Sequence, residues 1–393
     1  AAYAAAGVNA SDAKQSKLWE LACRGDLPAV KRESSAYRGE FIVQRGSTKC
    51  AQLSFIGRSL PPAPRTACDE ALDQHKLDMS RNVSVDFRLL DSLRLFVEIW
   101  AKKKLVKSKG PLGPFDWPSS SSCLERGAAK GGLLRHLLAT HAFDDLPNQD
   151  DFQTDAPSAE AALEARLTCA AVRSMSTEAS ITHRVTVLAE RGLKTRVVTV
   201  GPAWAQVLGH TVRKRLLHGL RATTGTYAPL VGAEDSELIE LFAGGSAETL
   251  VSSDLTRASD LLPLDLVSAV VDGLASSGRM STLEISVLRR LTGPQTLIYP
   301  DRTTVVSSAG ILMGLPTTWA LLSLVHLWWS DEVKRSTDPG SRRAHRMAIC
   351  GDDALLATTS RGAAHYKWLI AQCGGEISPG KHYECNRGTT RRA

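Results

Sequence analysis

The chain has 393 residues, with 48 Lys and Arg against 41 Asp and Glu, so its formal net charge is +7. Hydrophobic residues make up 43% and charged residues 23%, which excludes a disordered, collagenous or coiled-coil protein. The basic balance permits a polyanionic partner without requiring one. Eight cysteines are spread along the chain without a Cys-x-x-Cys pair, which disfavours a zinc ribbon and predicts reduced thiols inside a cell.

Two features bear on targeting and membranes. No basic segment precedes an apolar run at the start of the chain, so we expect no signal peptide. The first residue is Ala1 rather than Met, so we expect the chain to be a piece of a longer product. The uncharged stretch from Thr303 to Ser330 is long enough to span a membrane. Its first half is rich in Gly, Ser and Thr and contains a Pro, however, which predicts a loop followed by a buried helix.

The first 180 residues have mixed character. They contain helical patterns at 11–27 and 91–106, a proline-rich turn at 61–64 and an acidic surface loop at 144–155. A basic run from Lys102 to Lys109 leads into a Gly, Pro and Ser-rich segment that cannot be regular structure. That run is either a solvated face or a contact for nucleic acid.

From residue 181 onwards, strand and helix patterns alternate. Strands are predicted at 185–188 and 197–200, before Asp254, and on both sides of a tight turn within 349–356; helices are predicted at 202–220, 264–276, 282–291 and 319–333. The strands come from distant parts of the sequence and must meet in the folded chain. The pattern therefore predicts an α+β fold.

Two pairs of carboxylates are the most informative residues. Asp352 and Asp353 follow a glycine between two apolar strands, and two adjacent charges there are either a hairpin turn in water or a functional pair. Asp254 ends another strand, and Asp260 lies six positions later, where the chain turns into a helix. If Asp254 and Asp352 end neighbouring strands, they can hold two Mg²⁺ ions for phosphoryl or nucleotidyl transfer.

Cations and a glycine loop could complete such a site. Between residues 184 and 221 there are eight Lys or Arg and one Glu, and Arg191, Lys194 and Arg196 lie on an expected hairpin. Lys194 and Arg196 alternate along a strand and so share a face, from which they could contact phosphate. The run at 213–215 is either a solvated helix face or a further contact. In the loop from Gly310 to Trp319, two threonines either cap the next helix or line a nucleic-acid path.

The order of these motifs resembles viral RNA-dependent RNA polymerases. A basic hairpin, Asp-x₅-Asp, a Gly loop with a helix, Gly-Asp-Asp and a late Lys correspond to that family's motifs F, A, B, C and D. The sequence GILMGLPTTW at 310–319, with Leu324 and His326, is most similar to that of the narnavirus and ourmia-like (botourmiavirus) group. The resemblance covers about residues 181–385. Gly-Asp-Asp alone is weak, whereas five motifs in order are specific.

The resemblance implies a right-hand polymerase with fingers and an antiparallel palm sheet, and it implies roles for the acidic residues. Asp254 and Asp352 would hold Mg²⁺, or Mn²⁺ in its place, with Asp353 beside them. Asp260 would help to recognise the ribose 2′-OH. Lys381 matches the lysine of motif D and would be a proton donor to pyrophosphate.

Other residues would contact the nucleoside triphosphate. Arg191, Lys194 and Arg196 would bind its phosphates, and Gly314 and Thr318 would form the motif B loop and the start of its helix. Many members carry Asn late in motif B, where this chain has Ser323 as a possible substitute. The partners implied are template RNA, nascent RNA and NTPs, without a membrane span and with an unknown oligomeric state. The implied location is the host cytoplasm, with mitochondria not excluded.

The family comparison also divides the chain. Residues 1–180 would be an N-terminal extension and fingers, 181–250 fingers with the basic hairpin, and 251–393 the palm. The thumb that should follow motif D is expected to be largely truncated, because little sequence remains after Lys381.

Two other functions remain open. A reverse transcriptase has a related palm, but it usually carries an aromatic residue two positions before the first Asp of its pair, where this chain has Cys350. A non-catalytic RNA-binding remnant of a viral polymerase would also fit the charge. It would not explain four carboxylates at motif spacing, because carboxylates repel RNA unless metals intervene.

Overall fold

The computed structural model describes residues 60–141, 159–226, 242, 248–340, 342, 345–379 and 381–386. The helix expected at 11–27 and the acidic loop expected at 144–155 lie outside these residues. By contacts along the chain, one unit comprises residues 1–74 with 187–197, and a second comprises 75–186 with 198–393. This division follows packing, and the functional subdomain boundaries predicted above stay predictions.

The described part of the first unit is built around a hairpin tip. β1 (Thr182–Glu190) and β2 (Lys194–Val200) meet there, and Gly192 and Leu193 turn the chain with positive φ angles. The backbone N–H groups of Gly192 and Leu193 donate to the carbonyls of Leu60 and Pro61, at 3.1 Å each. The proline-rich segment therefore packs on the hairpin tip rather than serving as a free linker.

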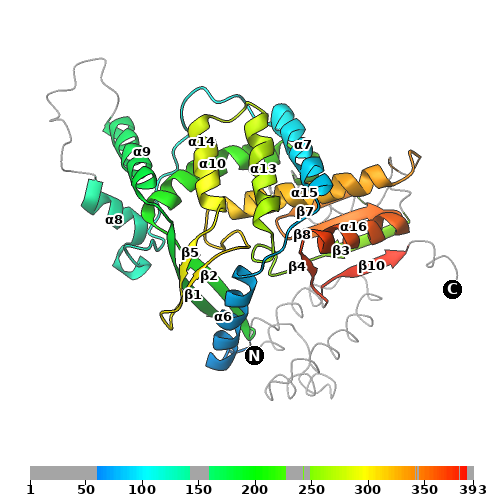
Figure 1. Ribbon diagram of the computed structural model, residues 1–393, viewed down its shortest axis with the longest axis horizontal. Coiled ribbons are helices and arrows are strands. Elements are labelled where there is room, and N and C mark those ends of the chain that lie inside the picture. The colour runs from blue at the N-terminus through cyan, green and yellow to red at the C-terminus, as the bar shows by residue number, and fades with distance from the viewer. Residues whose placement is uncertain are drawn as a thin grey trace, which may run out of the picture. The chain divides into compact units, whose positions relative to one another are not determined.

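The second unit contains most of the helices. They are α7 (Phe87–Lys104), α8 (Gly132–His141), α9 (Ala159–Thr177), α10 (Ala203–Arg221), α13 (Leu264–Ser276), α14 (Thr282–Thr292), α15 (Thr318–Ser336) and α16 (Ser360–Gln372); α6 (Arg65–Met79) begins in the first unit and ends in the second. Figure 1 shows α7, α10, α13 and α14 gathered side by side, and α13 packs on both α7 and α14. The helices predicted from periodicity are confirmed to within a few residues.

Two four-stranded sheets carry the strands. One has the order β2-β1-β5-β6, where β5 is Thr296–Ile298 and β6 is Thr304–Val306. The other has the order β10-β3-β8-β7 and is antiparallel, with β3 at Thr249–Ser253, β7 at Arg346–Cys350, β8 at Asp353–Thr358 and β10 at Tyr383–Asn386. A two-stranded ribbon pairs β4 (Leu255–Thr256) with β9 (Glu376–Ile377). The α+β prediction is confirmed.

Aliphatic and indole side chains fill the space beneath the β10-β3-β8-β7 sheet. α15 and α16 pack on this sheet, and Trp328, Trp329 and Tyr366 are fully buried. The uncharged stretch at 303–330 thus contains a loop and the buried first part of α15, as predicted, and also the short strand β6, which was not predicted. Among the described helices, none is both long and apolar enough to cross a membrane.

One detail of the sequence analysis is wrong. Thr317 is the N-cap residue of α15, but its side chain makes no capping hydrogen bond, and its hydroxyl is buried without a hydrogen-bond partner. Thr318 also does not cap the helix, because its hydroxyl donates to the carbonyl of Leu312 at 2.8 Å. Thr318 therefore ties the loop to the start of the helix, whereas Thr317 does not.

Candidate active site

Asp254 lies between two strand pairings that bring the end of the described chain beside it. β10 pairs with β3 just before Asp254, with Tyr383 opposite Ser252, and β9 pairs with β4 just after it, with Ile377 opposite Leu255. The described connecting residues, 378, 379, 381 and 382, must therefore lie close to Asp254. The N–H of Ser378 donates to the Asp254 carbonyl at 2.9 Å, and the ammonium of Lys381 forms an ion pair with its carboxylate.

The turn between β7 and β8 presents the second pair of carboxylates. The last paired residues are Cys350 and Asp353, so Gly351 and Asp352 form a two-residue turn. Gly351 has φ +68°, at the position where type II′ hairpin turns carry glycine. A Cβ at Gly351 would overlap the indole of Trp319 on α15. The glycine at position 351 is thus required by the turn itself, independently of any chemistry.

The two strand ends converge. β3 pairs with β8 in a register that ends with Ser253 opposite Ala354, so the next residues along the two strands are Asp254 and Asp353. Burial, followed by the charges of Asp352 and Asp254, raises the pKa of Asp353. The hydrogen bond to Asp254, followed by the charges of Asp254, Asp353 and Asp352, raises the pKa of Lys381. The three carboxylates and the lysine therefore form one electrostatic cluster.

The donors of this cluster are suitable for a hard divalent cation. Carboxylate oxygens are the ligands that Mg²⁺ prefers. The charges of Asp352 and Asp254 add to burial in raising the pKa of Asp353, and a bound cation would oppose both effects. Within the described ranges, no three His, Cys, Asp or Glu side chains are arranged closely enough to ligate a metal. In the structure, Lys381 is the cation that contacts Asp254.

Asp260 is held in a separate, buried environment. Its residue is 8% exposed, and the hydroxyl of Ser259 donates to its Oδ1 at 3.0 Å. Burial, supplemented by the charge of Asp78, raises the pKa of Asp260 to about 6, against the opposing effects of the Ser259 hydrogen bond and Arg257. Arg257 forms an ion pair with Asp78 at 3.3 Å. Asp260 therefore lies near an ion pair, Arg257 with Asp78, that the sequence analysis did not identify.

Replacing Asp260 with Asn should stabilise the protein at neutral pH. The folded pKa of about 6 lies above the ordinary 3.8, so between these two pH values the native protein keeps a proton that the unfolded chain has lost. The free energy of unfolding should therefore fall as the pH rises from about 4 to about 6. At roughly 1.4 kcal/mol per pKa unit, the wild type should lose about 3 kcal/mol of unfolding free energy in this way, and Asp260→Asn should not lose it.

Denaturant unfolding at pH 4 and pH 7, followed by tryptophan fluorescence, measures this effect. Asp338→Asn is the matched control, because it makes the same chemical change at an exposed aspartate. Equal pH dependence in wild type and Asp260→Asn would contradict the raised pKa of Asp260.

The motif B residues form the entrance to α15. Gly314 is exposed with φ +124°, and its carbonyl accepts from the amide of Gln206 at 3.1 Å. Thr318 starts the helix, one turn before Ser323. Ser323 is fully buried and its hydroxyl donates to the carbonyl of Trp319 at 2.8 Å, so its partner is the helix backbone. A nucleotide contact by Ser323 stays a prediction.

The three predicted phosphate ligands lie at the hairpin tip of the first unit. Lys194 and Arg196 are both exposed and alternate on β2, which confirms the shared face. Arg196 forms an ion pair with Glu190 across the hairpin at 3.2 Å. Arg191 is bridged to Pro62 through the backbone. The structure brings these three residues together, and their contact with a triphosphate stays a prediction.

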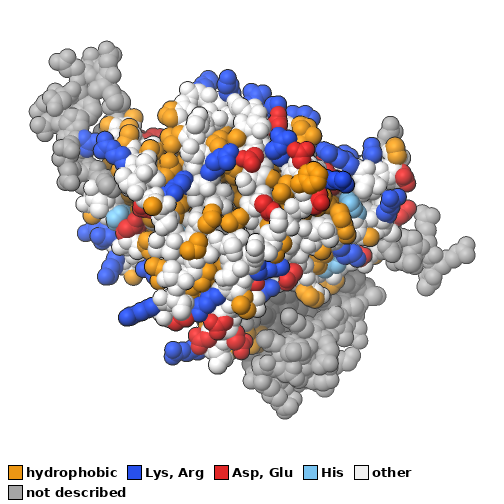
Figure 2. Space-filling model, viewed as in Figure 1, with side chains coloured by type: hydrophobic (Ala, Val, Ile, Leu, Met, Phe, Trp, Pro, Cys, Tyr) orange, Lys and Arg blue, Asp and Glu red, His pale blue; other side chains and the backbone are white. Residues whose placement is uncertain are grey.

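The basic run begins in the last turn of α7, where one of its lysines is ion-paired. Lys102 forms an ion pair with Glu98 at 2.6 Å. Figure 2 shows acidic side chains next to basic ones over the part of the surface formed by α7 and α13, where Arg94 pairs with Asp91 and Arg289 on α14 pairs with Asp272 on α13, each at 2.8 Å. The surface over α7 and α13 therefore carries mixed charge, and contact of the run at 102–109 with nucleic acid stays a prediction.

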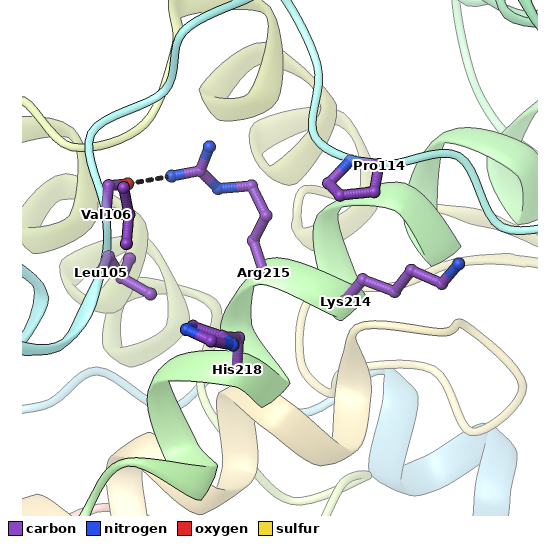
Figure 3. A pocket seen from close by; sticks show the side chains of 6 residues that line it. All are labelled: Leu105, Val106, Pro114, Lys214, Arg215 and His218. Carbon is purple, nitrogen blue, oxygen red and sulfur yellow. Dashed lines mark hydrogen bonds between the residues drawn. The ribbon is translucent and has the colours of Figure 1, made fainter.

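The cations at 213–215 also have structural partners. A cavity of about 280 Å³ is lined by six residues, Leu105, Val106, Pro114, Lys214, Arg215 and His218. Figure 3 shows Arg215 pointing toward Val106 and Lys214 pointing away past Pro114. Arg215 donates to the carbonyls of Val106 and Arg279 at 2.6 and 3.1 Å and pairs with the buried Glu284. Lys214 donates to the Phe115 carbonyl at 2.7 Å. Both side chains hold loops in place through backbone carbonyls. None of Asp254, Asp352 and Asp353 lines the cavity.

Sequence reasoning gave no role to three residues next to the carboxylates. His326 on α15 contacts the carbonyl of Gly351 through Nδ1 and the hydroxyl of Tyr366 through Nε2. Ser253, which precedes Asp254, hydrogen-bonds Tyr366. The only sequence signal was His326 itself, a histidine in an otherwise apolar helix. Its partners could not be recognised because they lie on other elements.

Comparison with known proteins supports the resemblance. The RNA-directed RNA polymerase of Saccharomyces 20S RNA narnavirus is 38% identical over 354 residues, which are 88% of this chain and 42% of that protein. The corresponding polymerase of Saccharomyces 23S RNA narnavirus is 31% identical over 86% of this chain and 38% of its own length. The RNA-dependent RNA polymerase of Ourmia melon virus is 28% identical over 48% of this chain and 24% of its own length.

The chain is related to narnavirus and ourmiavirus polymerases. The group predicted from the motifs is thereby confirmed. The chain spans less than half the length of each of these relatives. No protein-family model matches it.

Proposed function

We propose that the chain is the catalytic part of an RNA-dependent RNA polymerase that replicates a positive-strand viral RNA genome. The observation that carries the proposal is the convergence of Asp254, Asp352 and Asp353 at the ends of paired antiparallel strands in a relative of narnavirus polymerases. A right-hand fold with fingers and palm belongs to this proposal. The β10-β3-β8-β7 sheet with α15 and α16 would be the palm.

The chain's own residues would act on the reacting groups by charge and position. Asp254 and Asp352 would hold Mg²⁺, which supplies activation of the RNA 3′-hydroxyl and neutralisation of the departing pyrophosphate. Lys381 carries a proton beside these carboxylates, and its raised pKa keeps it charged at neutral pH. In the proposed reaction, Lys381 would donate that proton to a leaving oxygen. Asp260 would accept a hydrogen bond from the ribose 2′-hydroxyl when ionised.

The test is incorporation of NTPs by the purified chain on an RNA template, with a denatured sample and a sample in EDTA as controls. The proposal expects incorporation that requires template and Mg²⁺ and that prefers NTPs over dNTPs. Incorporation of dNTPs at equal efficiency would favour the reverse transcriptase alternative. Tight RNA binding without incorporation at any Mg²⁺ or Mn²⁺ concentration would favour a non-catalytic remnant.

The hairpin cations make a separate prediction. If Lys194 and Arg196 bind the triphosphate, replacing both with Ala should raise the KM for NTP by roughly 10-fold or more, because each lost charge-assisted contact is worth about 1.5–3 kcal/mol. Steady-state kinetics at saturating template measures this change. Lys334→Ala is the control, since Lys334 is an exposed lysine at the far end of α15. An unchanged KM in the double variant would contradict the phosphate role.

A further inference from the structure

A buried chain of hydrogen bonds joins the two residues that precede the candidate metal ligands. It starts at the carbonyl of Gly351, just before Asp352, where His326 Nδ1 lies at 3.0 Å. His326 Nε2 lies 2.5 Å from the hydroxyl of Tyr366, and Tyr366 in turn hydrogen-bonds the hydroxyl of Ser253, just before Asp254. The chain therefore passes from the β7–β8 turn, through α15 and α16, to the end of β3.

The chemistry of the partners fixes the direction of every hydrogen bond. The Gly351 carbonyl can only accept, so Nδ1 of His326 must carry the proton. Burial lowers the pKa of His326 to about 4, so the ring is neutral at pH 7 and its Nε2 can only accept. Tyr366 must then donate to His326, which leaves its oxygen to accept from Ser253. Ser253 can in turn accept from His382, whose Nδ1 lies at 3.2 Å.

This network lies at a turn that the hydrogen bonds of the sheet do not hold in place. The β7–β8 ladder ends with Cys350 opposite Asp353, so ladder bonds do not fix the two-residue turn that carries Asp352. His326 is fully buried, lies edge-on to Trp329 with ring centroids 5.3 Å apart, and stacks on Tyr366 at 5.8 Å. A packed imidazole with a single tautomer is a rigid support for the turn, because its ring cannot rotate without losing both partners.

We propose that His326 and Tyr366 are positioning residues that fix the Gly351–Asp352 turn relative to Asp254 and so set the geometry in which the two carboxylates bind a divalent cation. The inference rests on the proposed polymerase function for its meaning, but its central claim concerns metal affinity. It names no contact of His326 or Tyr366 with substrate or metal.

The test uses three variants of the 393-residue chain. Tyr366→Phe keeps the ring and removes the hydroxyl that joins His326 to Ser253. His326→Asn keeps an N–H donor where Nδ1 lies and loses the link to Tyr366, whereas His326→Leu loses both. The matched control is Ser330→Ala on the same helix, because Ser330 is also fully buried and bonded to a histidine, His345, at 2.9 Å.

Two readouts separate this inference from the proposed function. The first is Mn²⁺ affinity measured by electron paramagnetic resonance, which requires no polymerase activity. Tyr366→Phe and His326→Leu should weaken it by roughly 10-fold or more, and His326→Asn by less. The second is NTP incorporation, in which kcat should fall between roughly 10- and 100-fold while the KM for NTP changes little.

Ser330→Ala should lower the melting temperature to a similar extent without altering Mn²⁺ affinity or kcat. If Tyr366→Phe and His326→Leu match Ser330→Ala in every readout, the network is merely structural and the proposal is overturned. If the wild type binds Mn²⁺ but does not polymerise, and Tyr366→Phe and His326→Leu bind Mn²⁺ more weakly, the inference stands and the proposed function fails.

Discussion

Asp352→Asn should reduce RNA-templated NTP incorporation by at least roughly 1000-fold. The substitution keeps the size of the side chain and removes one charge from the cluster of Asp254, Asp352 and Asp353. A divalent cation held by this cluster would supply several kcal/mol of charge stabilisation in nucleotidyl transfer, and each 1.4 kcal/mol is a factor of ten in rate. The turn itself should persist, because it depends on Gly351, with φ +68°, and on the β7–β8 pairing.

The measurement is single-nucleotide extension under saturating NTP, with thermal unfolding of each variant recorded in parallel. Asp338→Asn is the control, since Asp338 is exposed and lies in the turn after α15. It should leave the rate within about two-fold of wild type, in the range of neutral surface substitutions. Equal incorporation by wild type and Asp352→Asn would exclude Asp352 as a metal ligand.

Gly314→Ala should destabilise the second unit by about 3 kcal/mol and lower its melting temperature by roughly 5 °C or more. Two effects combine at this position. Gly314 has φ +124°, a conformation that residues with a Cβ rarely adopt. A Cβ here would also overlap the carbonyl oxygen of Thr199, and Thr199 cannot withdraw easily because its N–H donates to Met313 at 2.7 Å.

Two control glycines separate these effects in thermal unfolding. Gly278 has φ +63° with open space around it, so Gly278→Ala should show the conformational strain alone, at about 1 kcal/mol. Gly340 has open space and no positive φ, so Gly340→Ala should be nearly neutral. If Gly314→Ala were no more destabilising than Gly278→Ala, the close approach to Thr199 would not constrain the loop.

Periodicity and turn chemistry were sufficient for several local elements of the second unit, but not for α8 and α9, which were not predicted. α13 begins after Pro263 and ends at Ser276, as predicted, because its apolar side chains recur at helical spacing. The strand–turn–strand at 349–356 was equally clear, since β-branched and apolar runs flank a glycine. Both signals lie within a dozen residues of sequence, so no distant contact is needed to recognise them.

The interpretation of the threonines as caps of α15 is wrong for a physical reason. A threonine before a helix is a good N-cap only if its hydroxyl faces the first free N–H groups. The loop from Gly310 folds back on the helix start, so the hydroxyl of Thr318 finds the carbonyl of Leu312 instead. Composition cannot distinguish these partners, because both are available within six residues.

The sequence by itself determined the carboxylates, their order and the tight turn that carries Asp352, and through motif order it determined the relationship to narnavirus polymerases. These properties depend on residue type and spacing alone. Only the tertiary structure decided that Lys381 contacts Asp254, because β9 and β10 pair on either side of Asp254 from more than 100 residues away. It also decided that His326 supports the turn through Tyr366 rather than packing as one more core residue, since hydrogen-bond partners on different elements are fixed by packing and leave no local pattern.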